Sequence, residues 1–203
     1  LRLLHAAKGY KAVAFDIFDT LLKRDCARPA DLFALMEVTH QAALGFAEAR
    51  VAAEAETRQT LGREVTLAEI YAHPALRGTD PAAECAAELA MIAPNRPVAQ
   101  AAAACHARGQ KVYAVSDMYL PEEQIEAMLQ KCGLDFLDGV FVSCEYRMQK
   151  RSGKLFKLFL QQTALRPAEV LFVGDSPRAD FAGAALAPSL YKNILSLGVR
   201  RTP

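Results

Sequence analysis

The sequence lacks the marks of a secreted, disulfide-bonded or membrane-spanning protein. Its cysteines are odd in number and form no CxxC pair, so we expect free thiols in a reducing, cytoplasmic compartment. No apolar run approaches the roughly 20 residues of a membrane-spanning helix, and the first residues do not have the layout of a signal peptide. The five cysteines are Cys26, Cys85, Cys105, Cys132 and Cys144.

The sequence also lacks an excess of charge of either sign. It has 24 lysines and arginines against 23 aspartates and glutamates, a net charge of +1. We therefore expect neither nucleic acid nor an anionic membrane as a partner. The absence of an initiator methionine is expected either of a trimmed sequence or of a domain cut from a larger multidomain chain. With 203 residues, 52% of them hydrophobic, the chain suits one globular core with a smaller insert.

Apolar patterning then predicts an α/β fold. Alanine is abundant and β-branched residues are sparse over residues 29–88, a texture typical of helices, and Thr66 to Glu69 has the pattern of a capping box. Outside this stretch, strands and helices alternate, which predicts a doubly wound, Rossmann-like parallel sheet. The expected strands are 10–18, 111–115, 140–143 and 170–174, with a weaker start at 189–191, and the expected helices are 97–108, 122–131 and 153–162. We expect the core to be 1–24 and 97–203, and an inserted α-helical cap to be 25–96.

Polar side chains follow each of the four clear strands. Because the carboxyl ends of parallel strands meet at one edge of the sheet, where ligands bind in such folds, these side chains are expected to come together. Asp16, Asp19 and Thr20 follow the first strand, Ser116 and Asp117 the second, Lys150 the third, and Asp175 and Asp180 the fourth.

This set of groups suits phosphoryl transfer. A carboxylate can attack phosphorus and form an acyl phosphate, which divides hydrolysis into two steps. Several carboxylates lie close together only when a cation neutralises them, and Mg²⁺ prefers such hard oxygen ligands together with water and a substrate phosphate. A hydroxyl and an ammonium can bind the remaining phosphoryl oxygens, which gain charge in the transition state.

With these motifs the sequence resembles the haloacid dehalogenase (HAD) superfamily over nearly its whole length. FDIFDTLL is similar to the family's first motif, VSDMYLP to the second, SCEYRMQKRSGKLF to the third and VGDSPRAD to the fourth. In the third motif the family's lysine stands six residues before a phenylalanine, so Phe156 selects Lys150 over Lys154. The insert resembles the family's helical C1-type cap. FDIFDT with SDMYLP also resembles HAD-like domains found beside bacterial surface-polysaccharide glycosyltransferases.

The resemblance implies a Mg²⁺-dependent phosphatase or phosphotransferase that acts on a small phosphorylated metabolite, such as a sugar phosphate. It implies Asp16 as the nucleophile and Lys150 as the catalytic lysine, with Thr20 and Ser116 binding the phosphoryl group. The implied metal ligands are Asp16, the backbone carbonyl of Phe18, Asp175 and Asp180.

The chain departs from the family's phosphatases at Phe18. There the family has a second aspartate, two residues after the nucleophile, which serves as general acid and base. Asp19 is the next residue and is a candidate to take over this role, although alternation along a strand would point its side chain away from that of Phe18. Water, or a leaving group of low pKa, would also make the donor unnecessary.

Further candidates for substrate binding lie beside the motifs. Arg24, where the chain enters the cap, is expected either to meet a phosphate or carboxylate or to form a surface ion pair. Asp117 is expected either to line the pocket or to cap the next helix. Arg50 and Glu54, four residues apart on one helix, are expected to form a helix-surface pair, or else to face the site.

Other functions stay open at this point. An aromatic residue at position 18 resembles the superfamily's haloacid dehalogenases, which need neither metal nor proton donor but lack the acidic fourth motif that this chain keeps. The phosphonate-cleaving branch uses a cap lysine, and the chain has no lysine between Cys26 and His106. A third alternative is a weak or inactive module that binds a phosphorylated ligand or supports a neighbouring glycosyltransferase.

Overall fold

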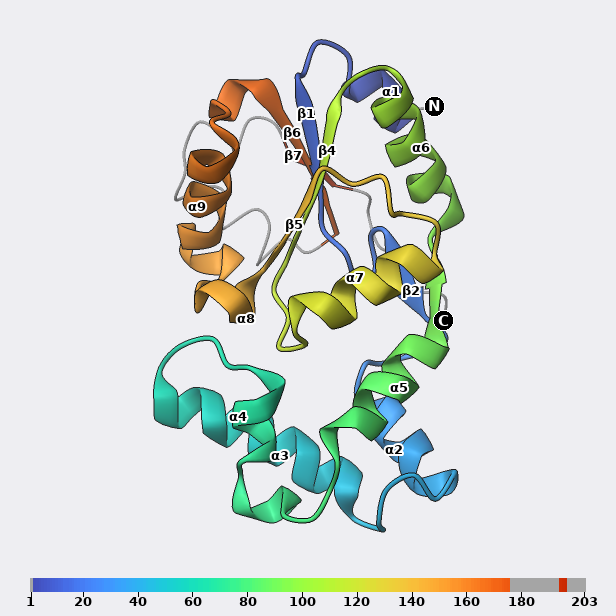
Figure 1. Cartoon of the computed structure of the whole chain (residues 1–203), viewed down its shortest axis with the longest axis vertical. Helices are drawn as coiled ribbons and strands as arrows, with labels where there is room; N and C mark the ends of the chain where they lie inside the picture. Colours follow the sequence, from blue (N-terminus) through green and yellow to red (C-terminus); the bar gives the residue numbers. More distant parts are fainter. Residues whose placement is uncertain (1, 176–193, 197–203) are drawn as a thin grey trace.

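The computed structural model describes residues 2–175 and 194–196. Asp180 and the weakly predicted strand start at 189–191 lie outside the described residues. The chain forms a parallel sheet covered by helices on both faces, with a second group of helices beyond one end of the sheet (Figure 1). The α/β fold with a Rossmann-like core is therefore confirmed.

The sheet has the strand order β5-β4-β1-β6-β7, and every neighbouring pair is parallel. From the central strand β1 the chain proceeds to β4 and β5 on one side, then crosses to β6 and β7 on the other. This reversal places a topological switch point beside β1, where doubly wound sheets bind ligands. The strands are β1 (Ala12–Phe15), β4 (Lys111–Ser116), β5 (Gly139–Val142), β6 (Val170–Gly174) and β7 (Ile194–Ser196).

The central strands are apolar on both faces because helices cover both faces. All residues of β1 and β6 are buried. Val13 and Phe15 of β1 join one core cluster, whereas Ala12 and Ala14 join the cluster on the opposite face. The first cluster packs under α1 (Arg2–Ala6), α6 (Arg96–Ala107) and α7 (Glu122–Lys131), and the second under α9 (Lys154–Thr163), which follows α8 (Ser143–Tyr146).

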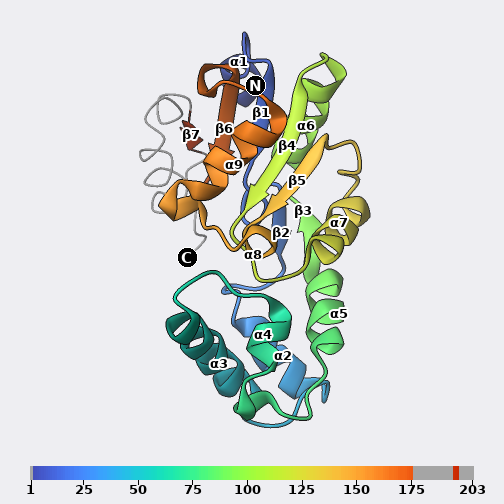
Figure 2. The same ribbon diagram turned by 60° about the vertical axis from the view of Figure 1, so that its left-hand side comes forward.

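The inserted residues form four α-helices beyond the sheet, which we call the cap, and α5 runs up to the end of α7 (Figure 2). An antiparallel two-stranded ribbon joins the cap to the core, with β2 leading in and β3 leading out. β2 ends at Arg24, at the expected start of the cap, and β3 ends at Pro94, just before α6. The elements are β2 (Leu22–Arg24), α2 (Asp31–Val38), α3 (Phe46–Leu61), α4 (Leu67–Tyr71), α5 (Pro81–Met91) and β3 (Ile92–Pro94). The 3₁₀ turns are η1 (Pro74–Leu76), η2 (Lys150–Ser152) and η3 (Pro167–Glu169).

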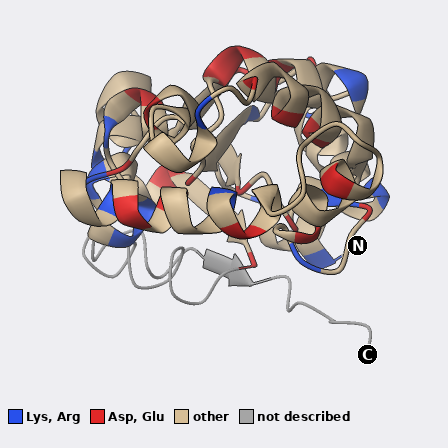
Figure 3. Ribbon diagram, turned by 90° about the horizontal axis from the view of Figure 1, so that it is seen from below, with Lys and Arg blue, Asp and Glu red and all other residues tan. Residues whose placement is uncertain are grey.

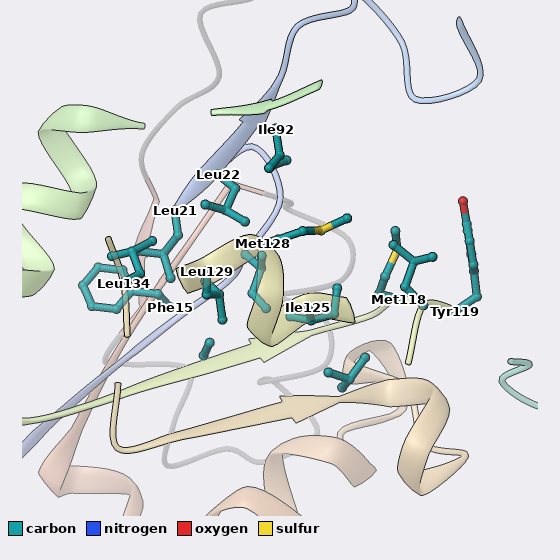
Figure 4. Close-up of a cluster of buried hydrophobic side chains, with 14 of the residues drawn as sticks. Phe15, Leu21, Leu22, Ile92, Met118, Tyr119, Ile125, Met128, Leu129 and Leu134 are labelled. Atoms are coloured by element: carbon teal, nitrogen blue, oxygen red, sulfur yellow. The ribbon is translucent and has the colours of Figure 1, made fainter. Parts of the chain in front are cut away.

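One apolar cluster runs from the sheet into the cap without a break. Figure 4 shows Phe15 of β1 beside Leu129 of α7, Leu21 and Leu134, with the ribbon residues Leu22 and Ile92 farther along the same cluster. Met118 and Tyr119 extend the same cluster toward the cap. The cap and the core therefore share buried surface, which favours a defined docking of one on the other.

Most expected elements are confirmed, including the capping box of α4, in which Thr66 and Glu69 bond each other's backbone. The first strand is shorter than the expected 10–18. The chain leaves the sheet after Asp16, because the backbone N–H groups of Thr20 and Leu22 both turn back to the carbonyl of Ile17. The ribbon was not predicted, since strands of three residues leave little periodic signal.

No helix among the described residues combines the length and apolar character needed to cross a membrane. Seen from the cap end in Figure 3, acidic and basic residues are interspersed over the described ribbon. This mixture agrees with the near-neutral net charge of the sequence.

Candidate active site

The strand ends meet beside β1 as expected. Phe15 pairs with Ala114 of β4 on one side and with Val173 of β6 on the other. The backbone N–H of Asp16 continues the ladder by donating to the carbonyl of Val173 at 2.8 Å. Asp16 therefore stands between the ends of β4 and β6, where Ser116 is 2% exposed.

A short polar contact at this edge joins Lys150 to Asp16. The ammonium Nζ of Lys150 lies 2.6 Å from Oδ1 of Asp16, and the two residues are only 2% and 6% exposed. A charge-assisted bond in such a buried place is strong and also fixes geometry. Lys154, the other lysine considered for this place, is exposed.

Asp117 holds the backbone of Lys150. Its Oδ1 accepts a hydrogen bond from the backbone N–H of Lys150 at 2.7 Å. The helix that follows, α7, has Pro121 at its N-cap and no side-chain cap bond. The expectation that Asp117 might cap that helix is therefore wrong, and its role in lining the pocket stays a prediction.

Thr20 is fully buried and links the first strand end to the fourth. Its Oγ1 donates to Oδ1 of Asp175 at 3.4 Å. Its carbonyl accepts a bond from the side-chain amide of Asn95 at 2.7 Å. Asn95 was missed in the sequence, since an asparagine before a helix suggests a cap, yet its side chain makes no cap bond to α6.

The expected metal ligands are only partly within the described structure. Asp16 and Asp175 end neighbouring strands, and Asp180 lies outside the described residues. Among the described residues no group of three or more His, Cys, Asp or Glu side chains is placed to hold a metal ion. Two carboxylates with substrate oxygens and water are nevertheless a usual donor set for Mg²⁺, so the site fits the ion while the assignment stays a prediction.

Phe18 and Asp19 lie in the turn after β1. Asp19 is exposed and has a left-handed backbone, with φ of 59°. Strand alternation therefore does not decide where its side chain points, contrary to the expectation. The half-buried ring of Phe18 lies under the guanidinium of Arg24, whose Cζ is 4.0 Å from the ring centroid.

Arg24 is bonded to the cap. Its Nε and Nη2 donate to the two carboxylate oxygens of Glu88, at 2.8 and 3.1 Å. The side chains are 10% and 2% exposed, so the expected surface ion pair is in fact buried. Burial disfavours the charge on Arg24, but the bonds and charge of Glu88 outweigh burial and raise its pKa. Contact of Arg24 with a substrate stays a prediction.

Arg50 forms the expected pair with Glu54, at 2.9 Å, but the arginine is 0% exposed and so does not lie on the helix surface. It also donates to both oxygens of Glu84, at 2.7 and 2.8 Å. Its guanidinium also lies 4.6 Å from the ring centroid of Tyr119. Burial, with the nearby charge of Glu84, holds the pKa of Tyr119 well above its usual value. The ion pair of Arg50 with Glu84 was not predicted from the sequence, because Glu84 lies 34 residues away.

A cavity of the cap lies apart from the site. A cavity of about 670 Å³ opens at the tip of the cap, between residues 37–44 and 78–83. Its lining includes His40 and Asp80 but none of the residues that end the strands. The cavity therefore belongs to the cap surface and not to the candidate active site.

A model of the haloacid dehalogenase-like hydrolases matches residues 10–187. The chain belongs to this family. All four strand ends described above fall within the matched residues, and so does the whole cap. As a haloacid dehalogenase-like hydrolase, the chain is a hydrolase by family.

Solved structures with the same fold include both dehalogenases and other members of the family. The L-2-haloacid dehalogenase of Xanthobacter autotrophicus with chloropropionic acid covalently bound is 21% identical, with a TM-score of 0.57, covering 87% of this chain and 74% of that one. A HAD family enzyme of Bacteroides thetaiotaomicron is 16% identical, with a TM-score of 0.62 and coverage of 93% and 94%. A second structure of that enzyme, in complex with magnesium and inorganic phosphate, is 15% identical, with a TM-score of 0.57 and the same coverage.

At these identities the likeness shows the fold of this haloacid dehalogenase-like hydrolase and not its substrate. None of the curated proteins matches the sequence. The association with glycosyltransferases stays a prediction.

Proposed function

We propose that this hydrolase is a Mg²⁺-dependent phosphatase or phosphotransferase that acts through an aspartyl-phosphate on a small phosphorylated metabolite, such as a sugar phosphate. The observation that carries the proposal is the Lys150 ammonium, 2.6 Å from the Asp16 carboxylate, together with a second acid, Asp175, at the end of the neighbouring strand. Carboxylates at neighbouring strand ends supply the hard oxygen ligands that Mg²⁺ prefers. The five free cysteines support placing the activity in the cytoplasm.

The reaction would proceed in two steps at Asp16. A carboxylate oxygen attacks phosphorus, an acyl phosphate forms, and the bond to the leaving oxygen breaks. Water then attacks the same phosphorus, which releases phosphate and regenerates the carboxylate. The Lys150 ammonium holds Asp16 in place and offsets charge on the phosphoryl oxygens, while the hydroxyls of Thr20 and Ser116 donate to those oxygens.

A bound Mg²⁺ would supply positive charge to the phosphoryl oxygens at that edge. Asp16, the Phe18 carbonyl, Asp175 and Asp180 are the residues proposed to hold it. The partner of this site is the small phosphorylated substrate, and we propose no nucleic acid or membrane partner.

The leaving oxygen needs a proton from another source, because Phe18 carries no acid. Asp19 or water would supply it, or the leaving group would depart as a stable anion. A side chain that donates a proton contributes about 10²–10⁴-fold to such rates. We therefore expect kcat/KM to be highest for substrates whose leaving groups have a low pKa.

Dehalogenation is the second candidate, and Phe18 is the observation that favours it. Asp16 would attack carbon, an ester would form, and halide would depart without a proton. The solved dehalogenase from Xanthobacter carries chloropropionic acid covalently bound. The retained Asp175 argues against this alternative. A weak or inactive module beside a glycosyltransferase is the alternative if neither reaction occurs.

Phosphate release from phosphate esters, acyl phosphates and sugar phosphates tests the proposal. Each substrate is measured with Mg²⁺, with EDTA, and with the Asp16→Asn variant. We expect turnover that requires both Mg²⁺ and Asp16. Halide release from 2-haloacids in the presence of EDTA would instead establish dehalogenase activity. If neither the wild type nor the Phe18→Asp variant turns over any substrate, the non-catalytic binding module is the remaining alternative.

A further inference from the structure

The cap reaches the core through residues 63–69, the segment between α3 and the end of the first turn of α4. Glu64 is 2% exposed, and its Oε2 accepts a hydrogen bond from the side-chain amide of Gln149 at 3.0 Å. Glu69 accepts a bond from the guanidinium of Arg147. Gln149 directly precedes Lys150, so both contacts fall on the loop that carries the lysine.

The same cap segment also holds the neighbouring loop of the core. The backbone N–H of Leu67 donates to the carbonyl of Tyr119 at 2.8 Å. Tyr119 lies two residues beyond Asp117, whose carboxylate binds the backbone N–H of Lys150. The loop that bears Lys150 and the loop that supports it are thus both bonded to one piece of the cap.

Ion pairs hold this cap segment in a fixed shape. Arg58 at the end of α3 donates to Glu64 through Nε and Nη2, at 3.2 and 2.9 Å. Arg63 donates to Glu69 at 2.7 Å. Glu69 also accepts from the backbone N–H of Thr66 within the capping box, at 2.9 Å. Because these bonds restrain residues 63–69, this segment can fix the position of the core loops that it contacts.

The side chains proposed to react are buried in the structure. Asp16 is 6% exposed, Lys150 is 2% exposed and Thr20 is 0% exposed. A phosphoryl group must touch these groups to react, so the site has to open before substrate binds. The contacts of residues 63–69 belong to the closed site that the structure shows.

We propose that Glu64 and Glu69 are positioning residues, which place the Lys150 ammonium against Asp16 when the cap docks. A lysine is a point charge on a flexible four-carbon stem, and fixing the backbone at its root removes much of that freedom. In this mechanism, docking of the cap also places the Lys150 ammonium. The kinetic readout of this inference rests on the proposed function, whereas the position of Lys150 does not.

The variant Gln149→Leu tests the inference, because it removes the bond to Glu64 at a half-buried position and keeps the size of the side chain. Gln149→Arg, which keeps a donor toward Glu64, is its matched conservative variant. Two quantities are measured: kcat and KM for phosphate release, and the rate at which a small acylating reagent modifies Lys150, read by mass spectrometry. Exposed Lys154 and Lys157 serve as internal references.

In Gln149→Leu we expect kcat to fall by about tenfold with KM nearly unchanged, because small displacements of a catalytic group cost this much or more. Acylation of Lys150 should rise by about tenfold while Lys154 and Lys157 react as before. Gln149→Arg should behave like the wild type, and so should Asp31→Asn, which breaks the exposed pair of Arg28 and Asp31 at the start of α2.

The inference is overturned if Lys150 stays protected and kcat stays unchanged in both Gln149→Leu and Glu64→Ala. If the wild type releases no phosphate from any substrate, the proposed function fails and acylation alone decides the inference. Faster acylation of Lys150 in Gln149→Leu would then still support the positioning role, and equal rates would refute it.

Discussion

At the scale of single residues, Phe18 is where this chain differs most in chemistry from a phosphatase with its own proton donor. The ring is held between the turn after β1 and the guanidinium of Arg24, and Arg24 is held in turn by Glu88. Both oxygens of Glu88 accept bonds from Arg24, so that carboxylate is engaged as an acceptor. The stack therefore places an apolar surface and a positive charge at the turn that follows Asp16, the proposed nucleophile.

Phe18→Asp should add a general acid and raise turnover of substrates with poor leaving groups. We expect a gain near the lower end of the usual range, about 10²-fold. Arg24 lies directly over this position and would favour the ionised form of the new carboxyl, which weakens it as an acid. The measurement is kcat/KM for a series of aryl and alkyl phosphates, plotted against the pKa of the leaving group.

The slope of that plot should become shallower in Phe18→Asp, because protonation relieves charge on the leaving oxygen. Asp19→Asn is the matched control and should leave the wild-type slope unchanged if no acid acts. A steeper slope in Asp19→Asn would instead show that Asp19 supplies the proton, which would exclude water and unassisted departure of the leaving group.

At the scale of elements, the cap is held together by an ion pair as well as by apolar packing. Arg50 of α3 and Glu84 of α5 are both 0% exposed and share two hydrogen bonds. The hydroxyl of Tyr71 in α4 adds a third bond to Glu84 at 2.8 Å. Burial and the charge of Glu84 raise the pKa of Tyr71, so its hydroxyl stays protonated and donates. Three helices thus meet at one carboxylate.

Arg50→Leu should destabilise the protein by about 3–5 kcal/mol, because it leaves the Glu84 carboxylate buried without its partner. The double variant Arg50→Leu with Glu84→Leu should recover much of this loss, since neither charge remains. Urea unfolding measures both free energies, with Asp31→Asn as a control that should differ little from the wild type. A single variant as stable as the wild type would contradict the structural importance of the pair.

At the scale of the whole molecule, docking of the cap should depend on pH through Glu69. Hydrogen bonds from Arg63, with further bonds from Thr66 and Arg147, outweigh desolvation and lower the pKa of Glu69 to about 2, from a usual value of 4.5. A lowered pKa in the folded state means that this stabilisation is complete above about pH 4.5 and is lost as the pH falls toward 2. Neutral and mildly acidic solutions should leave the docked cap intact.

Hydrogen exchange of backbone amides in α4 and in residues 147–150, followed from pH 6 to pH 2, measures this loss. Because exchange itself depends on pH, rates are compared with those of Glu69→Gln at each pH. We expect protection in the wild type to approach that of the variant only below about pH 4.5. Equal protection in the two proteins at pH 6 would show that Glu69 does not hold the cap.

The sequence by itself determined the order of elements and the chemistry at the strand ends. Apolar runs and Ala-rich helices set the α/β alternation, and residues adjacent to a strand must fall at its end whatever the rest of the chain does. For this reason the placement of Asp16 and Ser116 at one edge of the sheet could be predicted from local pattern alone. Lys150 follows β5 only after α8, and it was selected by its spacing to Phe156 in the family's third motif. The same local residue patterns indicate which classes of reaction these side chains can carry out.

Tertiary structure decided which distant residues meet. Glu88 and Arg24, Glu84 and Arg50, and Gln149 and Glu64 are separated by 64, 34 and 85 residues, and no periodicity links such pairs. Asn95 likewise gained its contact to Thr20 only when the ribbon brought the two ends of the insert together. Side chains that take partners across the fold are set by packing, because the energy of a buried charge depends on its three-dimensional surroundings and not on its neighbours in sequence.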